Sequence, residues 1–270
     1  MLLLHGWPEF WLSWEPVMQR LAGRFELIAP DLRGFGATDK PDVGPSDQAG
    51  AEVHAADMLA LLEALDIPRA GVVSHDVGAF VAQVMARQAP DRFAGLFFFD
   101  CPYPGVGARW AAPDHLKEIW YQSFHQKDFA AALVGSSREA CRLYFGHFLR
   151  HWSAGNPRPS TMCWRRGSIF PPARQPPGRL QLVHQPERRA AGDDARRLPP
   201  PPPVTVPSCI RWGALDPVLR VEWMDRIGGF FTDVDAQPLH GLGHFPHRED
   251  PDRAAAEIAG FFDRLWQVPR

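Results

Sequence analysis

The stretch that decides the fold is Gly71-Val72-Val73-Ser74-His75-Asp76-Val77-Gly78-Ala79-Phe80. A short apolar run leads through a turn centred on Asp76 into a helical pattern, and the residues two positions before and after the centre, Ser74 and Gly78, are small. That arrangement is typical of a nucleophile elbow, a strained strand-to-helix turn that pushes its central side chain outward. An aspartate at a helix start is also a common N-cap, so this stretch alone leaves both interpretations open.

Strand-length apolar runs alternate with amphipathic helical patterns on both sides of this turn. The runs that predict strands are Leu2–Leu4, Glu26–Ala29, Ala70–Val73, Gly95–Phe99, Ser208–Trp212 and Val234–Pro238. The patterns that predict helices are Trp14–Leu21, Val53–Leu65, Val77–Gln88 and Ala254–Trp266. Nearly continuous apolar strands that alternate with helices indicate a parallel sheet covered on both faces. Ligand sites in such sheets lie at the carboxyl ends of the strands.

The alternation stops between about Ala111 and Pro203. Two helical, aromatic-rich patterns come first, Leu116–Phe129 and Glu139–Trp152, and nine arginines with many prolines follow between residues 158 and 197. We predict an inserted lid at residues 111–203 that divides one core into residues 1–110 and 204–270.

The arginine-rich part of the lid has an unusual composition for a packed segment. A change of reading frame by one base would turn residues 178–184 into a sequence containing GGFNWY, and we hypothesise that residues 158–198 are translated out of frame. The alternative is a basic segment that binds an anion or a partner. Glu187, Asp193 and Asp194 interrupt that basic segment.

Composition bounds the class of protein. The chain has 270 residues, 45% hydrophobic content and a net charge of −2. These values suit one sizeable core and predict no general attraction to nucleic acid or to an anionic membrane. Four scattered cysteines indicate a reduced, cytoplasmic protein without a disulfide framework: Cys101, Cys141, Cys163 and Cys209. The chain begins inside a predicted strand, so we expect that upstream strands are missing.

Three further features accompany the Asp76 turn. The loop His5-Gly6-Trp7-Pro8 follows the first predicted strand, where the backbone N–H of Trp7 could join that of Val77 in an oxyanion hole. Asp216 follows the strand that ends near Trp212. His244 lies in a glycine-rich loop after the last predicted strand. The order nucleophile, acid, histidine is that of α/β-hydrolases.

Five stretches resemble those of epoxide hydrolases and their dehalogenase relatives: LLLHGWPEFWLSW (2–14), IAPDLRGFGATDKP (28–41), VVSHDVGAFVAQ (72–83), RWGALDPVL (211–219) and GLGHFPHREDP (241–251). The resemblance covers residues 1 to about 155 and 203 to 270. It implies an α/β-hydrolase core with a helical cap. It also implies that Asp76 is the nucleophile, His244 the general base and Asp216 the acid that orients the base.

Aspartate suits displacement at an sp³ carbon, because its attack forms an ester with an alkyl group that an activated water then hydrolyses. The expected substrate is therefore a small hydrophobic epoxide, with a pocket lined by Trp7, His75 and Phe245. Tyr121 lies in a stretch, IWYQSF, that resembles the first cap motif of the family. The resemblance implies that it protonates the leaving oxygen, and a packing tyrosine is the alternative. The sequence has only two other tyrosines, Tyr103 and Tyr144, so the second cap tyrosine of the family is absent.

Other functions remain open at this point. A haloalkane or haloacetate dehalogenase would share the triad, although Val77 cannot donate to a halide and Trp7 could supply one indole N–H. A ligand-binding protein with the same fold and no catalysis is a second alternative. No cofactor is expected. No metal is expected from His240, His244 and His247, since the glycines of their loop deny it the helical spacing of known metal motifs. A homodimer stays open.

Overall fold

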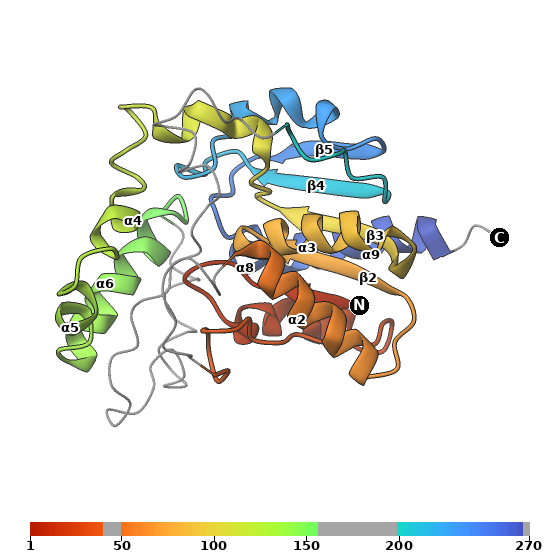
Figure 1. The fold of residues 1–270 in the computed structure, drawn as a ribbon, viewed down its shortest axis with the longest axis horizontal. Coiled ribbons are helices and arrows are strands. Elements are labelled where there is room, and N and C mark those ends of the chain that lie inside the picture. The colour runs from red at the N-terminus through yellow and green to blue at the C-terminus, as the bar shows by residue number, and fades with distance from the viewer. Residues whose placement is uncertain (40–49, 156–198, 267–270) are drawn as a thin grey trace.

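The computed structural model describes residues 1–39, 50–155 and 199–266. At its centre is a parallel sheet with the strand order β1-β2-β3-β4-β5 (Figure 1). The strands are β1 Leu2–Leu4, β2 Ala70–His75, β3 Phe93–Phe99, β4 Ser208–Gly213 and β5 Val234–Leu239. The predicted class, an α/β fold built on a parallel sheet, is therefore confirmed.

The predicted strand at Glu26–Ala29 is shorter than expected. Ile28 makes an isolated parallel bridge with Leu2. Leu3 N–H donates to the Ile28 carbonyl at 2.8 Å, and Ile28 N–H donates to the Met1 carbonyl at 2.9 Å. The ladder ends there because β1 has few residues to pair with and because Pro30, which has no N–H, follows at once.

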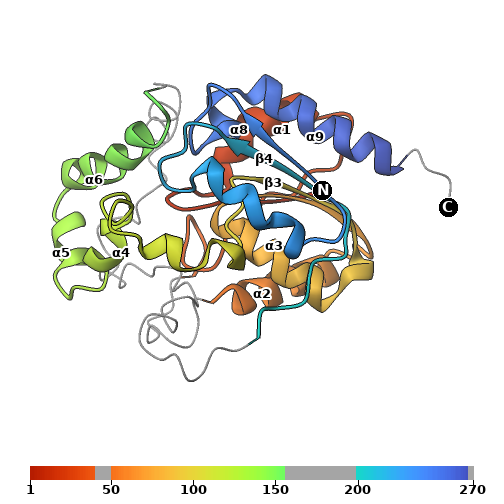
Figure 2. The ribbon, with the colours of Figure 1, turned by 90° about the horizontal axis from the view of Figure 1, so that it is seen from above.

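Helices cover both faces of the sheet (Figure 2). One face carries α1 (Glu15–Leu21), α8 (Pro246–Glu249) and α9 (Pro251–Trp266), and the other carries α2 (Ala51–Ala64) and α3 (Val77–Gln88). Successive residues of a strand point to opposite faces. Val73 and Phe97 accordingly pack in the core under α1 and α9, whereas Val72 and Leu96 pack in the core under α2 and α3. This two-sided burial explains why the central strand β3 is apolar throughout.

A second group of helices lies to one side of the sheet (Figure 1). It consists of α4 (Trp120–Phe124), α5 (Ala130–Val134) and α6 (Arg138–His151). Ser137 caps α6 by accepting a 3.0 Å hydrogen bond from the Ala140 N–H. The 3₁₀ helices are η1 Trp11–Trp14, η2 Pro90–Arg92, η3 Pro104–Ala111 and η5 Val221–Gly229.

The predicted helix at Leu116–Phe129 is confined to α4. The turns before it are tied down by the buried His115 ring, whose two nitrogens face the carbonyls of Trp110 and Val218 at 2.8 Å each. Residues 158–198, on which the reading-frame hypothesis rests, lie outside the described residues. Among the described helices, none combines the length and the apolar character needed to cross a membrane.

The turn between β2 and α3 has the strained geometry that its sequence predicts. Asp76 has φ 46° and ψ −113°, a backbone conformation that residues other than glycine rarely adopt. A Cβ on Gly78 would lie 2.5 Å from the Leu4 carbonyl oxygen and 2.8 Å from the His5 carbonyl oxygen. Both neighbours are backbone atoms, so only glycine lets α3 approach β1 this closely.

We therefore expect Gly78→Ala to lower the free energy of unfolding by about 3 kcal/mol, because an added methyl group must displace the backbone of β1. Urea denaturation measures the effect. Gly228→Ala is a matched control, since a Cβ at Gly228 would meet nothing within 4 Å. A Gly78→Ala protein as stable as the control would contradict the close approach.

Candidate active site

Asp76 meets the loop that follows β1. The Trp7 backbone N–H donates to Oδ2 of Asp76 at 3.1 Å. A Cβ on Gly6 would lie 2.8 Å from the Cβ of Asp76, so the loop lies directly against the elbow. Val77 opens α3, and the N–H of a first helical residue has no acceptor within its own helix. The structure thus brings one of the two backbone donors expected from the sequence, the Trp7 N–H, to the Asp76 carboxylate, and places Val77 directly after Asp76 at the start of α3.

His244 and Asp216 form a buried pair beside Asp76. Nδ1 of His244 lies 2.6 Å from Oδ2 of Asp216. The other carboxylate oxygen of Asp216 accepts from the N–H groups of Val218 and Leu219 at 2.7 and 3.0 Å. Nε2 of His244 is buried and has no hydrogen-bond partner among the residues that the structure describes. The pair therefore has one imidazole nitrogen left for chemistry.

The charges around His244 change its proton affinity. Burial lowers the pKa of His244, but the carboxylates of Asp216 and, more weakly, Asp76 outweigh it and raise that pKa to about 9. In the protein without substrate, His244 is accordingly protonated at pH 7 and balances the two carboxylates.

Aromatic side chains from α4 and α6 cover this site. The Trp7 ring stacks on the Tyr121 ring with centroids 4.3 Å apart and an interplanar angle of 5°. Trp152, the C-cap residue directly after α6, lies 5.6 Å from Trp7 and 5.1 Å from His244, ring to ring. Burial and the nearby Asp76 charge raise the pKa of Tyr121, so its phenol stays protonated. Tyr121 is thus a protonated phenol held close to Asp76.

One expected pocket residue lies elsewhere. Both ring nitrogens of His75 are used inside the protein: Nδ1 lies 2.8 Å from Oε2 of Glu9, and Nε2 lies 2.7 Å from the His244 carbonyl oxygen. Its side chain is fully buried beneath the site and does not line a pocket. Phe245 is also fully buried and packs edge-on against the His244 ring. Of the three expected pocket residues, Trp7 contacts both Tyr121 and Trp152, and Phe245 lies 6.3 Å from Trp152, ring centroid to ring centroid.

Sequence reasoning missed two buried acids of the site, Glu9 and Asp100. Asp100 follows β3 with φ 41°, and its Oδ1 accepts from the Gly213 N–H at 2.7 Å. Burial and the neighbouring Asp216 raise the pKa of Asp100 well above its usual range. The signal was available, because an acid directly after a buried strand of a parallel sheet lies at the carboxyl edge.

Within the described residues, the group whose ligand atoms converge enough to hold a metal ion is Glu9, His75 and His247, with these atoms within 4.8 Å of one another. These residues already bind one another by hydrogen bonds. The loop set considered from the sequence does not converge: His244 faces Asp216, His247 faces Glu9, and His240 is exposed.

A parallel sheet with a strained elbow and a buried histidine–carboxylate pair at its carboxyl edge defines the α/β-hydrolase class. The chain belongs to the α/β-hydrolase fold family, whose model matches residues 1–251. It is similar to Epoxide hydrolase 1 of Caenorhabditis elegans, with 32% identity over 98% of this chain and 65% of the relative. It is also 36% identical to the Soluble epoxide hydrolase of a Corynebacterium species, over 55% of this chain and 51% of that protein.

The chain thus spans about two thirds or less of the length of these curated relatives. Among solved structures, the epoxide hydrolase CorEH matches with a TM-score of 0.74 and 26% identity, covering 98% of this chain and 91% of that one. A variant of an epoxide hydrolase from Bacillus megaterium matches with a TM-score of 0.75 and 22% identity, covering 97% and 93%. Because its identity is only 22%, this second match shows similarity of fold alone.

Proposed function

We propose that the protein hydrolyses small hydrophobic epoxides to diols through an alkyl ester on Asp76. The observation that carries this proposal is the 3.1 Å hydrogen bond from the Trp7 N–H to the carboxylate of Asp76 itself. A serine hydrolase needs its oxyanion donors near a substrate carbonyl. Here the Trp7 N–H donates instead to the side-chain carboxylate at the elbow. This arrangement is required when the carboxyl carbon of Asp76 itself becomes the tetrahedral centre.

In the first step, a carboxylate oxygen of Asp76 attacks an epoxide carbon, and the bond between that carbon and the ring oxygen breaks. A carboxylate nucleophile needs no base to activate it, unlike a serine hydroxyl. The leaving oxygen takes a proton from Tyr121, whose phenol is buried beside the site. The product of this step is an ester between Asp76 and the substrate.

In the second step, His244 removes a proton from a water that attacks the carboxyl carbon of Asp76. Asp216 orients the imidazole through its 2.6 Å contact with Nδ1. The N–H groups of Trp7 and Val77 stabilise the oxyanion. The ester then breaks, the diol leaves with one former Asp76 oxygen, and the two protons of the water restore the diol hydroxyl and the phenol of Tyr121.

The proposal also includes the domain boundaries and the cellular location of the protein. We assign residues 111–203 to the cap and residues 1–110 and 204–270 to the core. The three cysteines in the described residues, Cys101, Cys141 and Cys209, are free and buried. Free thiols support a cytoplasmic location.

Replacing Tyr121 tests the epoxide assignment. With styrene oxide, the rate of ester formation in Tyr121→Phe is expected to fall about 100-fold, since a phenol that protonates the leaving oxygen acts as a general acid. Phenylalanine keeps the stacking on Trp7. Rapid-quench kinetics that follow the protein-bound ester by mass spectrometry measure the rate.

Tyr144→Phe is the matched control, because the Tyr144 hydroxyl faces His125 at 2.5 Å and is expected to matter little for ring opening. A wild-type protein that releases halide from alkyl halides but forms no diol from epoxides would instead indicate a dehalogenase. A wild-type protein that binds epoxides and converts neither substrate would indicate a ligand-binding role.

A further inference from the structure

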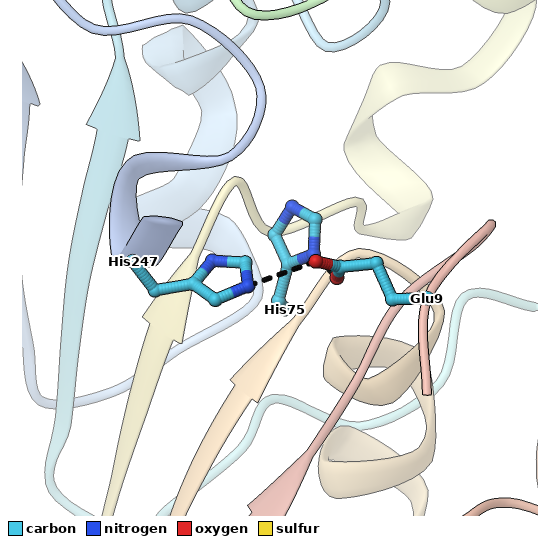
Figure 3. Close-up of side chains that lie close together, drawn as sticks. All are labelled: Glu9, His75 and His247. Carbon is cyan, nitrogen blue, oxygen red and sulfur yellow. Dashed lines mark hydrogen bonds and ion pairs between the residues drawn. The ribbon is translucent and has the colours of Figure 1, made fainter. Parts of the chain in front are cut away.

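The carboxylate of Glu9 lies beneath the site and bridges the imidazole rings of His75 and His247 (Figure 3). Oε2 of Glu9 lies 2.8 Å from Nδ1 of His75, and Oε1 of Glu9 lies 3.0 Å from Nε2 of His247. The side chains of all three residues are fully buried. A buried charge with two partners in fixed geometry is costly to disturb, so this cluster is well suited to hold backbone segments in place.

Each member of the cluster comes from a different part of the active site. Glu9 lies in the loop that carries the Trp7 N–H, and it also accepts from the Gly6 N–H at 3.3 Å. His75 ends β2 and directly precedes Asp76. His247 lies in α8, three residues after His244. The cluster therefore joins three segments: the loop after β1 that carries the Trp7 N–H (the oxyanion loop), the nucleophile elbow at Asp76, and the loop of residues 240–245 that carries His244 (the base loop).

The directions of the hydrogen bonds agree with this role. Burial opposes ionisation of Glu9, but His247 and His75 outweigh it and hold the pKa of Glu9 well below its usual range. An ionised Glu9 accepts at both oxygens, so Nε2 of His247 donates to it. Nε2 of His75 then donates to the His244 carbonyl at 2.7 Å, which ties the base loop to the residue before Asp76.

His247 holds the base loop from its other end. Its ring packs 4.4 Å from Trp14 and 5.9 Å from Phe99, centroid to centroid, so the ring is locked in place. Glu249 also anchors the base loop by accepting from the N–H groups of Gly243 and Phe245 at 2.8 and 2.9 Å. Loss of the His247 contact is therefore expected to shift the loop without unfolding it.

We propose that His247 is a positioning residue: its hydrogen bond to Glu9 sets His244 at the distance from Asp76 that ester hydrolysis requires. This inference rests on the proposed function, since it concerns the second step of that reaction. The first step needs Asp76 and Tyr121 and makes no use of His244 as a base. Displacement of the base loop should consequently slow ester hydrolysis much more than ester formation.

The test compares His247→Phe with His247→Gln in single-turnover kinetics with styrene oxide. Phenylalanine keeps a ring against Trp14 and Phe99 but cannot donate to Glu9. Hydrolysis of the ester is expected to slow roughly 10- to 100-fold in His247→Phe, as misplaced catalytic groups do, while ester formation changes less than about threefold. The ester should accumulate and be visible as added protein mass.

Glutamine can place its amide nitrogen near the position of Nε2, so His247→Gln is expected to recover hydrolysis to within about threefold of wild type, a change small beside the loss in His247→Phe. His54→Phe, which replaces a buried histidine of α2, controls for the loss of an interior imidazole. Thermal unfolding checks that each variant is folded.

Hydrolysis at the wild-type rate in folded His247→Phe would overturn the inference. Equal slowing of both steps, without recovery in His247→Gln, would also overturn it, because that pattern indicates a purely structural residue. Failure of the proposed function looks different: wild type would form no diol, and no variant would form an ester.

Discussion

With His244 replaced by glutamine, the protein is expected to take up one equivalent of epoxide and then stop as an ester on Asp76. Ester formation needs a carboxylate and a proton donor, and both remain in this variant. Hydrolysis needs a base for the attacking water, and glutamine cannot accept that proton. Removal of a general base typically costs a factor of roughly 10² to 10⁴, so hydrolysis is expected to slow by about 1,000-fold.

Intact-protein mass spectrometry after incubation with styrene oxide would show an added mass of one substrate, and peptide mapping would place it on Asp76. His240→Gln is a matched control, since His240 is an exposed histidine four residues earlier in the same loop. It should turn over normally and carry no adduct. Adduct-free His244→Gln protein, in the presence of an active wild type, would rule out the two-step route.

The pKa of His244 predicts how the second step depends on pH. Burial lowers this pKa, but Asp216 and Asp76 raise it to about 9 in the free protein. Alkylation converts the Asp76 carboxylate into a neutral ester and removes one of the charges that raise the pKa of His244. The pKa of His244 therefore falls in the ester, which frees the imidazole to act as a base. Hydrolysis should become faster as pH rises through that lower pKa and then level off, and His244→Gln should lack this rise.

The spacing of apolar residues and the residue types at turns were enough to predict most of the fold from the sequence. Helix α3 spans Val77–Gln88 as predicted, because an apolar strand, a small-residue turn and an amphipathic pattern all mark its start. The segment Leu116–Phe129 has a similar pattern but forms only the short helix α4. Its preceding turns are fixed by His115, which contacts Val218 about one hundred residues away, and no local pattern encodes that contact.

The same distinction applies to the site. Asp76, Asp216 and His244 each follow a strand, so strand order alone brings them to one edge of the sheet. The sequence prediction places His75, the residue directly before Asp76, among the pocket residues. Alternation along β2 instead turns it toward Glu9 and His247. Glu9 lies only two residues after Trp7, but its role depends on partners 66 and 238 positions away.

Replacing Asp76 with alanine is expected to abolish diol formation, with a loss on the order of 10⁴-fold or more, because no ester can form without the nucleophile. The fold should survive this change. Alanine keeps the Cβ that the turn already accommodates, and the variant loses a partly buried carboxylate that accepts only one hydrogen bond in the described structure, from Trp7. The free energy of unfolding is therefore expected to stay the same or to rise slightly.

Asp66→Ala is the matched control for this experiment. Asp66 also has a positive φ, 53°, but lies in the exposed turn after α2. It should retain wild-type diol formation, so any loss in Asp76→Ala cannot come from placing alanine at a positive φ. If Asp76→Ala still converted more than about a hundredth of the wild-type amount of epoxide, far more than loss of a nucleophile allows, His244 would have to direct water onto the epoxide itself. The position of Asp76 at the elbow would then serve binding or charge balance, and the covalent route would be excluded.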